Sequence, residues 1–360
     1  MLVTLIVFVI VFGIVVISHE LGHFIIAKMN GIRVVEFAVG MGPELVKFTK
    51  GDTRYVLRLL PFGGACVFDG EDGNFQIDDK EKTITGQKEN LEGTFNNANV
   101  WARISTVLAG PIFNIILAYL LALIVVGYTG SVTPVISGIT DGYPAQEAGM
   151  QTGDVITRIN GDKIYLANEV TMVPLLDKGK PVELEYKRGD DIFKTTVTPK
   201  FSEEDNRYYI GFSIGEHVEC KGFDLLKYSA YEVRYWLKTT IKSLSMLVQG
   251  KLSKDDLSGP VGIANVIDET IEVAKPYGIS TVVLTMINFT VLLSVNLGVM
   301  NLLPIPALDG GRLIFLIIEV FRGKPIPPEK EGFVHFIGFV ALIILMVFVM
   351  FNDITRIFNK

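Results

Sequence analysis

Apolar residues gather in four long stretches that alternate with polar segments along the chain. The stretches run over residues 2–27, 104–128, 279–321 and 333–351. A transmembrane helix needs about 20 apolar residues, so the third stretch is too long for one straight span. Pro304, Pro306 and the pair Gly310-Gly311 interrupt it and prevent a continuous helix. The pattern predicts a polytopic α-helical membrane protein with about four transmembrane helices, the third followed by a broken segment.

The first stretch begins at Leu2 and carries no charged residue before His19. A cleaved signal peptide would also be apolar, but basic residues would precede it and a small-x-small cleavage site would follow it. Neither feature flanks residues 2–27. We therefore interpret this stretch as a retained transmembrane helix.

Basic residues flank the apolar stretches at one set of ends. They are Lys28, Arg33, Arg103, Arg322, Lys324 and Lys330. Because short cytoplasmic loops are enriched in lysine and arginine, loops 29–103 and 322–332 are expected in the cytoplasm. The N-terminus and residues 129–278 would then face outside. The two cysteines, Cys66 and Cys220, would lie on opposite sides of the membrane, where they cannot form a disulfide.

The two polar insertions have different patterns. In the cytoplasmic loop, "ELVKFTK" and "RYVLRLL" flank a Gly51-Asp52 turn and predict a membrane-associated β-hairpin, and residues 70–98 are polar and expected to be mobile. In the outer insertion, residues 129–215 alternate turns with short strands and predict a small α/β domain. Residues 223–248 are rich in aromatic, leucine and basic residues, which predicts an interfacial amphipathic helix. A soluble helix packed on the outer domain is the alternative.

These boundaries give the predicted order of parts. The order is transmembrane helix 1 (1–28), cytoplasmic loop (29–103), transmembrane helix 2 (104–128), outer α/β domain (129–215), outer helical region (216–278), transmembrane helix 3 with its broken segment (279–322), and a loop with transmembrane helix 4 (323–360). The composition agrees, because 49% of the residues are hydrophobic. The net charge is −6, so no basic face indicates nucleic-acid binding, and the lipid bilayer is the expected partner.

The first stretch ends in "HELGH", residues 19–23, which puts three polar side chains in apolar surroundings. His19 and His23 are four residues apart, so their imidazoles lie on one helix face and can hold one zinc ion at about 2.0–2.1 Å each. Glu20 is one position around the helix and can reach a water molecule at the metal without filling a ligand position. The alternative, histidines that are merely satisfied polar groups in a helix bundle, does not explain three costly polar groups together.

A catalytic zinc usually has a third protein ligand. His217 falls in the outer insertion, and His335 begins the fourth stretch, from which only an unusual fold would bring it to the metal. Asp309 lies in "NLLPIPALDGGRL", where non-helical backbone must be surrounded by protein or line a wet cavity. Asp309 is therefore the candidate third ligand, and a helix-capping aspartate is the alternative. This ligand set would also accept cobalt or iron.

A zinc site with a glutamate base at membrane depth indicates hydrolysis of a bond in or near the membrane. Water must reach it, so a channel from the cytoplasm is expected. "HELGH" followed by "NLLPIPALDGG" resembles the site-2 protease family of intramembrane zinc metalloproteases. "GYPAQEAGMQTGDVITRING" is similar to a PDZ domain. Together the motifs cover nearly the whole chain and resemble the RseP-type branch, the bacterial regulator-of-sigma-factor proteases.

The resemblance implies roles for individual residues. It makes His19, His23 and Asp309 zinc ligands and Glu20 the catalytic base. It also implies substrate-binding positions, which are Asn301, Pro306, Asn296 and Asn114. Separately, the apolar alternation of residues 54–60 and their nearness in sequence to the first span predict that this strand, with Val56 and Leu57, contacts the substrate backbone. The hairpin would take up an unwound substrate as an added strand, with "VGMGP" included in its sheet. A plain cytoplasmic hairpin is the alternative.

The same resemblance implies the activity and its setting. Such proteases cut the transmembrane segments of single-pass proteins, including anti-sigma factors and remnant signal peptides, and the active site lies toward the cytoplasm. The chain departs from the longer family members in having room for one extracytoplasmic PDZ domain where they have two. Two other classes stay open: a non-catalytic PDZ-bearing membrane adaptor with a structural metal, and a transporter or channel. Glu20 disfavours the first, and the lack of a second broken-helix repeat disfavours the second.

Overall fold

The computed structural model describes residues 2–70, 92–177, 179–203, 207–251 and 258–358. The predicted mobile segment, residues 70–98, falls largely outside these ranges. Two compact units make up the chain. One combines residues 1–121 with 237–360, and the other is residues 122–236. The predicted division into seven parts stays a prediction.

Four helices of the described chain are long and apolar enough to cross a membrane. Their candidate spans are Val3–Met29, Val100–Thr129, Ile279–Asn301 and Glu329–Arg356. They belong to α1 (Leu2–Met29), α2 (Val100–Thr129), α7 (Ile279–Asn301) and α9 (Pro328–Phe358). The prediction of about four spans is confirmed. Their large apolar side chains are widely exposed, as expected where lipid is the solvent.

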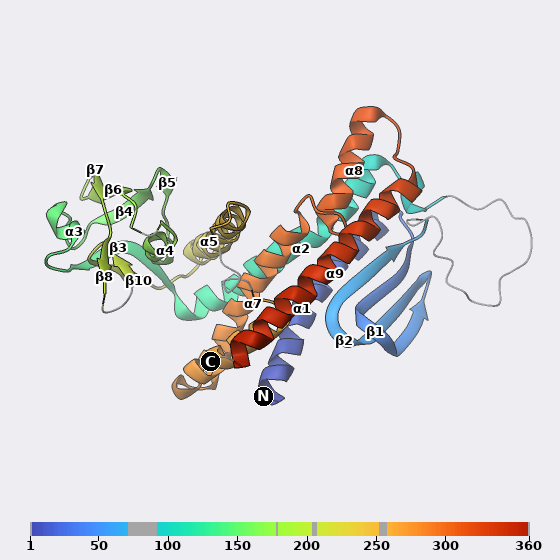
Figure 1. Cartoon of the computed structure of the whole chain (residues 1–360), viewed down its shortest axis with the longest axis horizontal. Helices are drawn as coiled ribbons and strands as arrows, with labels where there is room; N and C mark the ends of the chain where they lie inside the picture. The colour runs from blue at the N-terminus through green and yellow to red at the C-terminus, as the bar shows by residue number, and fades with distance from the viewer. Residues whose placement is uncertain (1, 71–91, 178, 204–206, 252–257, 359–360) are drawn as a thin grey trace, which may run out of the picture. The chain divides into compact units, whose positions relative to one another are not determined.

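The break in the third apolar stretch is also confirmed. Helix α7 ends at Asn301, and a separate helix, α8 (Asp309–Arg322), begins at Asp309 (Figure 1). Close packing requires the two glycines at the start of α8. A Cβ on Gly310 would overlap the Leu302 and Leu303 carbonyl oxygens, and one on Gly311 would lie 2.9 Å from the Pro306 Cα. The broken segment therefore folds back tightly onto itself.

The loop between the first two candidate spans forms the predicted hairpin, but with longer strands than the sequence indicated. Strand β1 (Val34–Lys50) pairs antiparallel with β2 (Thr53–Phe68). Both strands bend, so residues 54–57 pair with residues 36–39 on one side and with residues 46–49 on the other. Residues 64–68 pair with the first part of β1 from its far side. Residues 54–57 are thus central in the sheet, and residues 64–68 form one of its edges.

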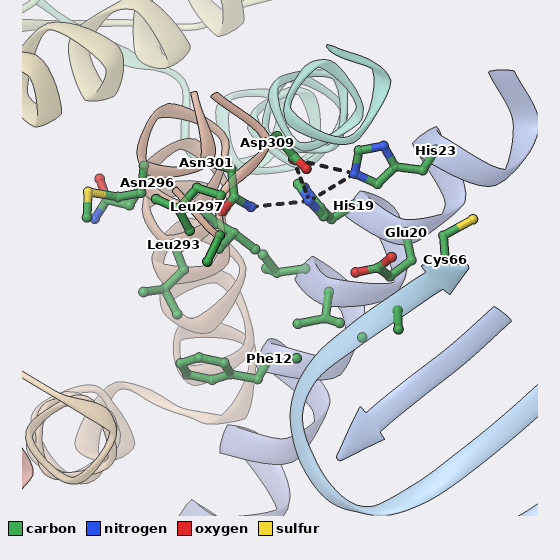
Figure 2. Close-up of a pocket in the computed structure, with 18 of the residues that line it drawn as sticks. Phe12, His19, Glu20, His23, Cys66, Leu293, Asn296, Leu297, Asn301 and Asp309 are labelled. Atoms are coloured by element: carbon green, nitrogen blue, oxygen red, sulfur yellow. Dashed lines mark hydrogen bonds and ion pairs between the residues drawn. The ribbon is translucent and has the colours of Figure 1, made fainter. Parts of the chain in front are cut away.

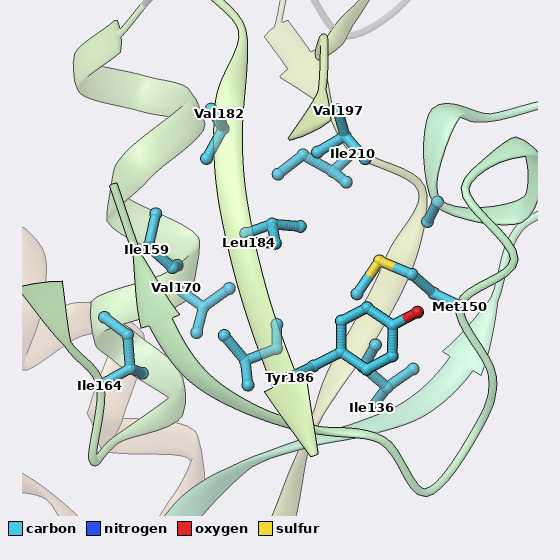
Figure 3. Close-up of a cluster of buried hydrophobic side chains, with 12 residues drawn as sticks. Ile136, Met150, Ile159, Ile164, Val170, Val182, Leu184, Tyr186, Val197 and Ile210 are labelled. Atoms are coloured by element: carbon cyan, nitrogen blue, oxygen red, sulfur yellow. The ribbon is translucent and has the colours of Figure 1, made fainter. Parts of the chain in front are cut away.

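The smaller unit is built around an antiparallel sheet with strand order β10-β3-β4-β6-β7. The strands are β3 (Ser131–Ile139), β4 (Val155–Ile159), β6 (Val182–Arg188), β7 (Asp191–Val197) and β10 (Phe212–Val218), with short β5 (Asp162–Lys163) paired to β4 and a separate pair, β8 (Lys200–Ser202) and β9 (Arg207–Tyr209). The helices are α3 (Pro144–Glu147) and α4 (Ala167–Asp177). Apolar side chains such as Ile136, Val170 and Leu184 fill its core (Figure 3). This is the predicted small α/β domain.

The remaining helices follow the small domain in sequence. Helix α5 (Phe223–Val248) spans the residues for which a helix was predicted, and α6 (Pro260–Ala274) follows it. The interfacial position of α5 stays a prediction. Two short 3₁₀ turns, Phe95–Asn97 and Lys275–Tyr277, precede α2 and α7. Helix α6 packs against α1, α7 and α9, and its Ile267 and Ile271 lie in a buried apolar cluster with Phe8 of α1.

Candidate metal centre

Helices α1 and α8 bring three candidate ligands together. His19 and His23 project from one face of α1, and Asp309 is the first residue of α8 (Figure 2). The two Nε2 atoms are 3.2 Å apart, and the Asp309 Oδ2 lies 3.1 Å from His19 Nε2 and 3.4 Å from His23 Nε2. These are the three side chains of the described chain whose ligand atoms gather closely enough to hold a metal ion.

The spacing of these atoms fits zinc. Ligand atoms at about 2.0–2.1 Å in a tetrahedron lie about 3.3 Å from one another, close to the separations found here. Asp309 Oδ2 is buried and accepts no hydrogen bond. Two imidazole nitrogens and a carboxylate oxygen therefore point at a common position, where a cation would compensate their converging lone pairs.

Contacts from α2 orient both histidines. His23 Nδ1 lies 2.9 Å from the Thr106 carbonyl oxygen, so Nδ1 carries the proton and Nε2 keeps its lone pair for a metal. His19 Nδ1 lies 3.3 Å from the amide of the fully buried Asn114, whose Oδ1 lacks a hydrogen-bond partner. Rotating that amide by half a turn lets Oδ1 accept the Nδ1 proton, which frees His19 Nε2 in the same way.

A glycine of α2 leaves room for the two rings. A Cβ added to Gly110 would overlap His23 Nε2 and lie 2.8 Å from His19 Cε1. The helix backbone therefore lies directly against the imidazoles. In the sequence, the Gly110-Pro111 pair stands out only as an interruption of the second apolar stretch. Its contact with the histidines depends on how α1 and α2 pack.

Glu20 lies against the sheet and lines the same cavity as the two histidines. It is 8% exposed and lies against β2 beside Cys66 (Figure 2). A Cβ on Gly64 would lie 2.5 Å from the Glu20 Cγ and 3.0 Å from Oε1, and the Cys66 backbone N–H hydrogen-bonds to the carboxylate. The edge of the sheet thus fixes the carboxylate near the histidines. Gly64 is a second residue that the sequence pattern alone did not indicate.

A cavity of about 730 Å³ opens beside the cluster. Residues of α1, β2, α7 and α8 line it, with Ser258 from the segment before α6 and Ile263 from the first turn of α6. Asn296 and Asn301, both predicted to bind substrate, are among the lining residues. Asn301 Nδ2 lies 3.2 Å from His19 Nε2, and the side-chain amide oxygen Oδ1 of Asn296 accepts a hydrogen bond from the Thr240 hydroxyl.

The other predicted substrate-binding residues lie elsewhere. Asn114 lies behind His19, as described above, and Pro306 packs against α9 at Gly338. Val56 is buried in the centre of the sheet, and its neighbour Leu57 is 47% exposed. None of the four is among the lining residues of the cavity in the described structure.

Comparisons with known proteins place the chain in a family. The model of Peptidase family M50 matches residues 7–345. The regulator of sigma-W protease RasP of Bacillus subtilis is 35% identical over 426 aligned residues, which cover 99% of each chain. The zinc metalloprotease RasP of Bacillus licheniformis is 34% identical over 425 residues, again 99% of each chain. The PDZ domain of an SdrC-like protein from Listeria monocytogenes covers 23% of this chain and 86% of its own, at 22% identity and a TM-score of 0.21.

The fold and the comparisons together define a multi-pass membrane protein of the zinc metalloprotease class. The chain belongs to Peptidase family M50, and the resemblance to site-2 proteases is confirmed.

Proposed function

We propose that this intramembrane protease hydrolyses peptide bonds within or near the transmembrane segments of single-pass membrane proteins. The observation that carries the proposal is the ligand cluster His19, His23 and Asp309, with Glu20 beside it, at the wall of a cavity between apolar helices. A cavity at that place admits water and an extended chain to groups that would otherwise be sealed in lipid.

In this proposal the three ligands hold one zinc ion. When bound, zinc polarises the scissile carbonyl and lowers the pKa of the attacking water. Glu20 takes a proton from that water and later passes it to the leaving amine. The Cys66 N–H and the missing side chain at Gly64 keep the Glu20 carboxylate in place. The Thr106 carbonyl oxygen, and the Asn114 Oδ1 once its amide is rotated by half a turn, keep the proton of each imidazole on Nδ1, which leaves both Nε2 atoms free as ligands.

The edge of the sheet offers a place for the substrate backbone. A helical substrate hides its peptide bonds, so it must be extended before hydrolysis, and an edge strand can pair with it. Residues 64–68 pair with β1 on one side, and no described strand pairs with their other side. Gly63, Gly64 and Ala65 line the cavity. We therefore assign strand addition to this edge, and Val56 and Leu57 support it from within the sheet.

The natural substrates are proposed by class. The relative in Bacillus subtilis is named a regulator of sigma-W protease, which supports anti-sigma factors as one class, and remnant signal peptides are the other. The basic residues beside the spans favour a cytoplasmic face for the metal centre and an extracytoplasmic place for the small domain. A non-catalytic adaptor with a structural metal is the second candidate. The position of Glu20 beside the cluster argues against it, because a structural site needs no base.

Cleavage by purified protein tests the proposal. The protein in detergent is incubated with a model single-pass peptide, with and without a zinc chelator, and the products are identified by mass spectrometry. We expect cuts within or next to the apolar segment, inhibition by the chelator, and recovery after zinc is added back. A metal-loaded protein that leaves every such peptide intact would favour the adaptor.

A further inference from the structure

The turn that leads into α8 has an unusual backbone conformation. Ala307, two residues before Asp309, has a φ of +76°, in the left-handed region that residues other than glycine rarely adopt. Such a conformation persists where the surroundings hold it in place. The position of the Asp309 carboxylate therefore depends on whatever holds this turn.

His335 of α9 contacts the turn directly. Its Nδ1 accepts a hydrogen bond from the Ala307 backbone N–H at 2.8 Å. Its ring also packs against Phe315 of α8, with the ring centroids 5.6 Å apart. One side chain thus joins α9 to the turn before Asp309 and to the helix after it. Because Nδ1 is the acceptor, this ring is neutral and carries its proton on Nε2.

A second contact lies one turn further along α9. A Cβ added to Gly338 would overlap the Pro306 carbonyl oxygen and lie 2.5 Å from the Pro306 Cβ. Helix and loop therefore meet without an intervening side chain. His335 and Gly338 are three residues apart, so both lie on the face of α9 that covers the turn.

We propose that this face of α9 is a positioning element for the metal centre. His335 and Gly338 hold the Pro306–Ala307 turn in its left-handed form, and the turn aims the Asp309 carboxylate at the two histidines. The inference rests on the proposed role of Asp309 as a metal ligand. His335 is a positioning residue in this account, since it acts on the metal through the loop and is not one of the clustered ligands.

Two substitutions at His335 separate the hydrogen bond from simple packing. His335→Asn places an amide oxygen close to the position of Nδ1, so the Ala307 N–H keeps its acceptor. His335→Leu keeps an apolar side chain but offers no acceptor. Zinc affinity is measured by competition with a chelator, without substrate, and kcat and KM are measured on the same preparations. We expect His335→Leu to lose about 10–100-fold in zinc affinity, as when other supporting partners of metal ligands are removed. Its kcat should fall with little change in KM, and His335→Asn should stay within about threefold of the unmodified protein in zinc affinity.

Two glycines of α9 provide an independent matched pair. Gly338→Ala pushes against Pro306 and should lower zinc affinity. Gly332→Ala adds the same methyl group to the same helix, where no atom lies within 4 Å, and should change nothing. If His335→Leu does not fold, His335→Gln replaces it. The glutamine side-chain oxygen lies one bond further from the backbone than His335 Nδ1, so it is poorly placed to accept the hydrogen bond from the Ala307 N–H.

Unchanged zinc affinity in both His335→Leu and Gly338→Ala would overturn the inference. Equal losses of zinc affinity in His335→Asn and His335→Leu would show that the hydrogen bond to the Ala307 N–H does not position the turn. The zinc measurement needs no substrate, so it stands even if the proposed peptidase activity fails. Conversely, the α9 variants could bind zinc like the unmodified protein, which would overturn only the positioning role of α9. Normal cleavage by the unmodified protein would then still support the proposed function.

Discussion

Buried polar groups occur in both compact units, but they are satisfied in different ways. In the small domain, Asp154 accepts hydrogen bonds from the Arg188 guanidinium at 2.7 Å and from the Gln151 N–H at 2.8 Å. In the other unit, residues 1–121 with 237–360, here called the membrane unit, His19, His23 and Asp309 point their acceptor atoms at one another. A buried carboxylate that accepts hydrogen bonds helps to stabilise the fold. Acceptor atoms that converge on one point repel one another, and a bound cation removes this repulsion. The difference supports the proposal that the chemistry takes place in the membrane unit.

The largest expected effect comes from removing the base while keeping the ligands. Glu20→Gln preserves the size of the side chain but cannot take a proton. We expect cleavage to fall by about 10²–10⁴-fold, the usual loss for a general base, with zinc still bound. Metal content and initial rates are measured together. Loss of zinc from this variant would mean that Glu20 belongs to the ligand set.

A smaller effect is expected from filling the space beside the imidazoles. Gly110→Ala puts a methyl group against His23 Nε2 and His19 Cε1. Zinc affinity should fall by about 10–100-fold, because both rings must move. Gly13→Ala, where no atom lies within 4 Å, is the control on α1. Equal zinc binding by both variants would show that the rings do not need their present positions.

Displacing the base should cost less than removing it. Gly64→Ala adds a Cβ 2.5 Å from the Glu20 Cγ, and Gly64 has no left-handed φ that would itself oppose alanine. We expect kcat to fall about tenfold, because a shifted carboxylate is poorly aligned with the water. KM and zinc content should stay unchanged. A loss confined to zinc content would contradict the contact with Glu20.

The smallest effect on activity is expected in the small domain. Burial tends to raise the pKa of Asp154, but hydrogen bonds from Arg188 and Gln151 outweigh it and lower that pKa. The ionised carboxylate therefore stabilises the domain above the unfolded pKa of about 3.9, and this contribution is lost as the pH falls through the lowered folded pKa. Asp154→Asn should reduce the free energy of unfolding of the small domain by about 2 kcal/mol and weaken its acid sensitivity.

Cleavage of a short model peptide by the Asp154→Asn protein should stay normal, because the candidate ligands and the base all lie in the other unit. Thermal unfolding followed at several pH values, beside the cleavage assay, measures both effects. A large loss of cleavage in a folded, zinc-loaded protein would show that the small domain takes part in the chemistry.

The sequence predicted those features that depend on local spacing. The four apolar stretches set the spans, and the four-residue spacing of His19 and His23 set their common helix face. The choice of Asp309 as the candidate third ligand came from its place in the broken segment and from the need for a third ligand. The zinc metalloprotease class and the family resemblance are confirmed by relatives that match almost the full chain.

Other features depend on tertiary packing and had no local signal. The bend in β1 encloses residues 54–57 between two parts of that strand, so the edge beside the cavity is residues 64–68. The contacts of Gly110 with the imidazoles and of Gly64 with Glu20 join residues far apart in sequence. His335 was considered only as a ligand, and its hydrogen bond to Ala307 requires the packing of α9 on the broken segment.

Metal content and cleavage measured together in Asp309→Ala and Glu20→Gln test the central claim most directly. Asp309→Ala leaves two histidines, so zinc content and cleavage should fall together, and excess zinc should restore part of the activity. Glu20→Gln should keep one equivalent of zinc and lose cleavage. If Glu20→Gln loses its zinc while Asp309→Ala keeps a full equivalent, the two carboxylates have the opposite roles. If both variants cleave as fast as the unmodified protein, the assignment of this cluster as the active site is wrong.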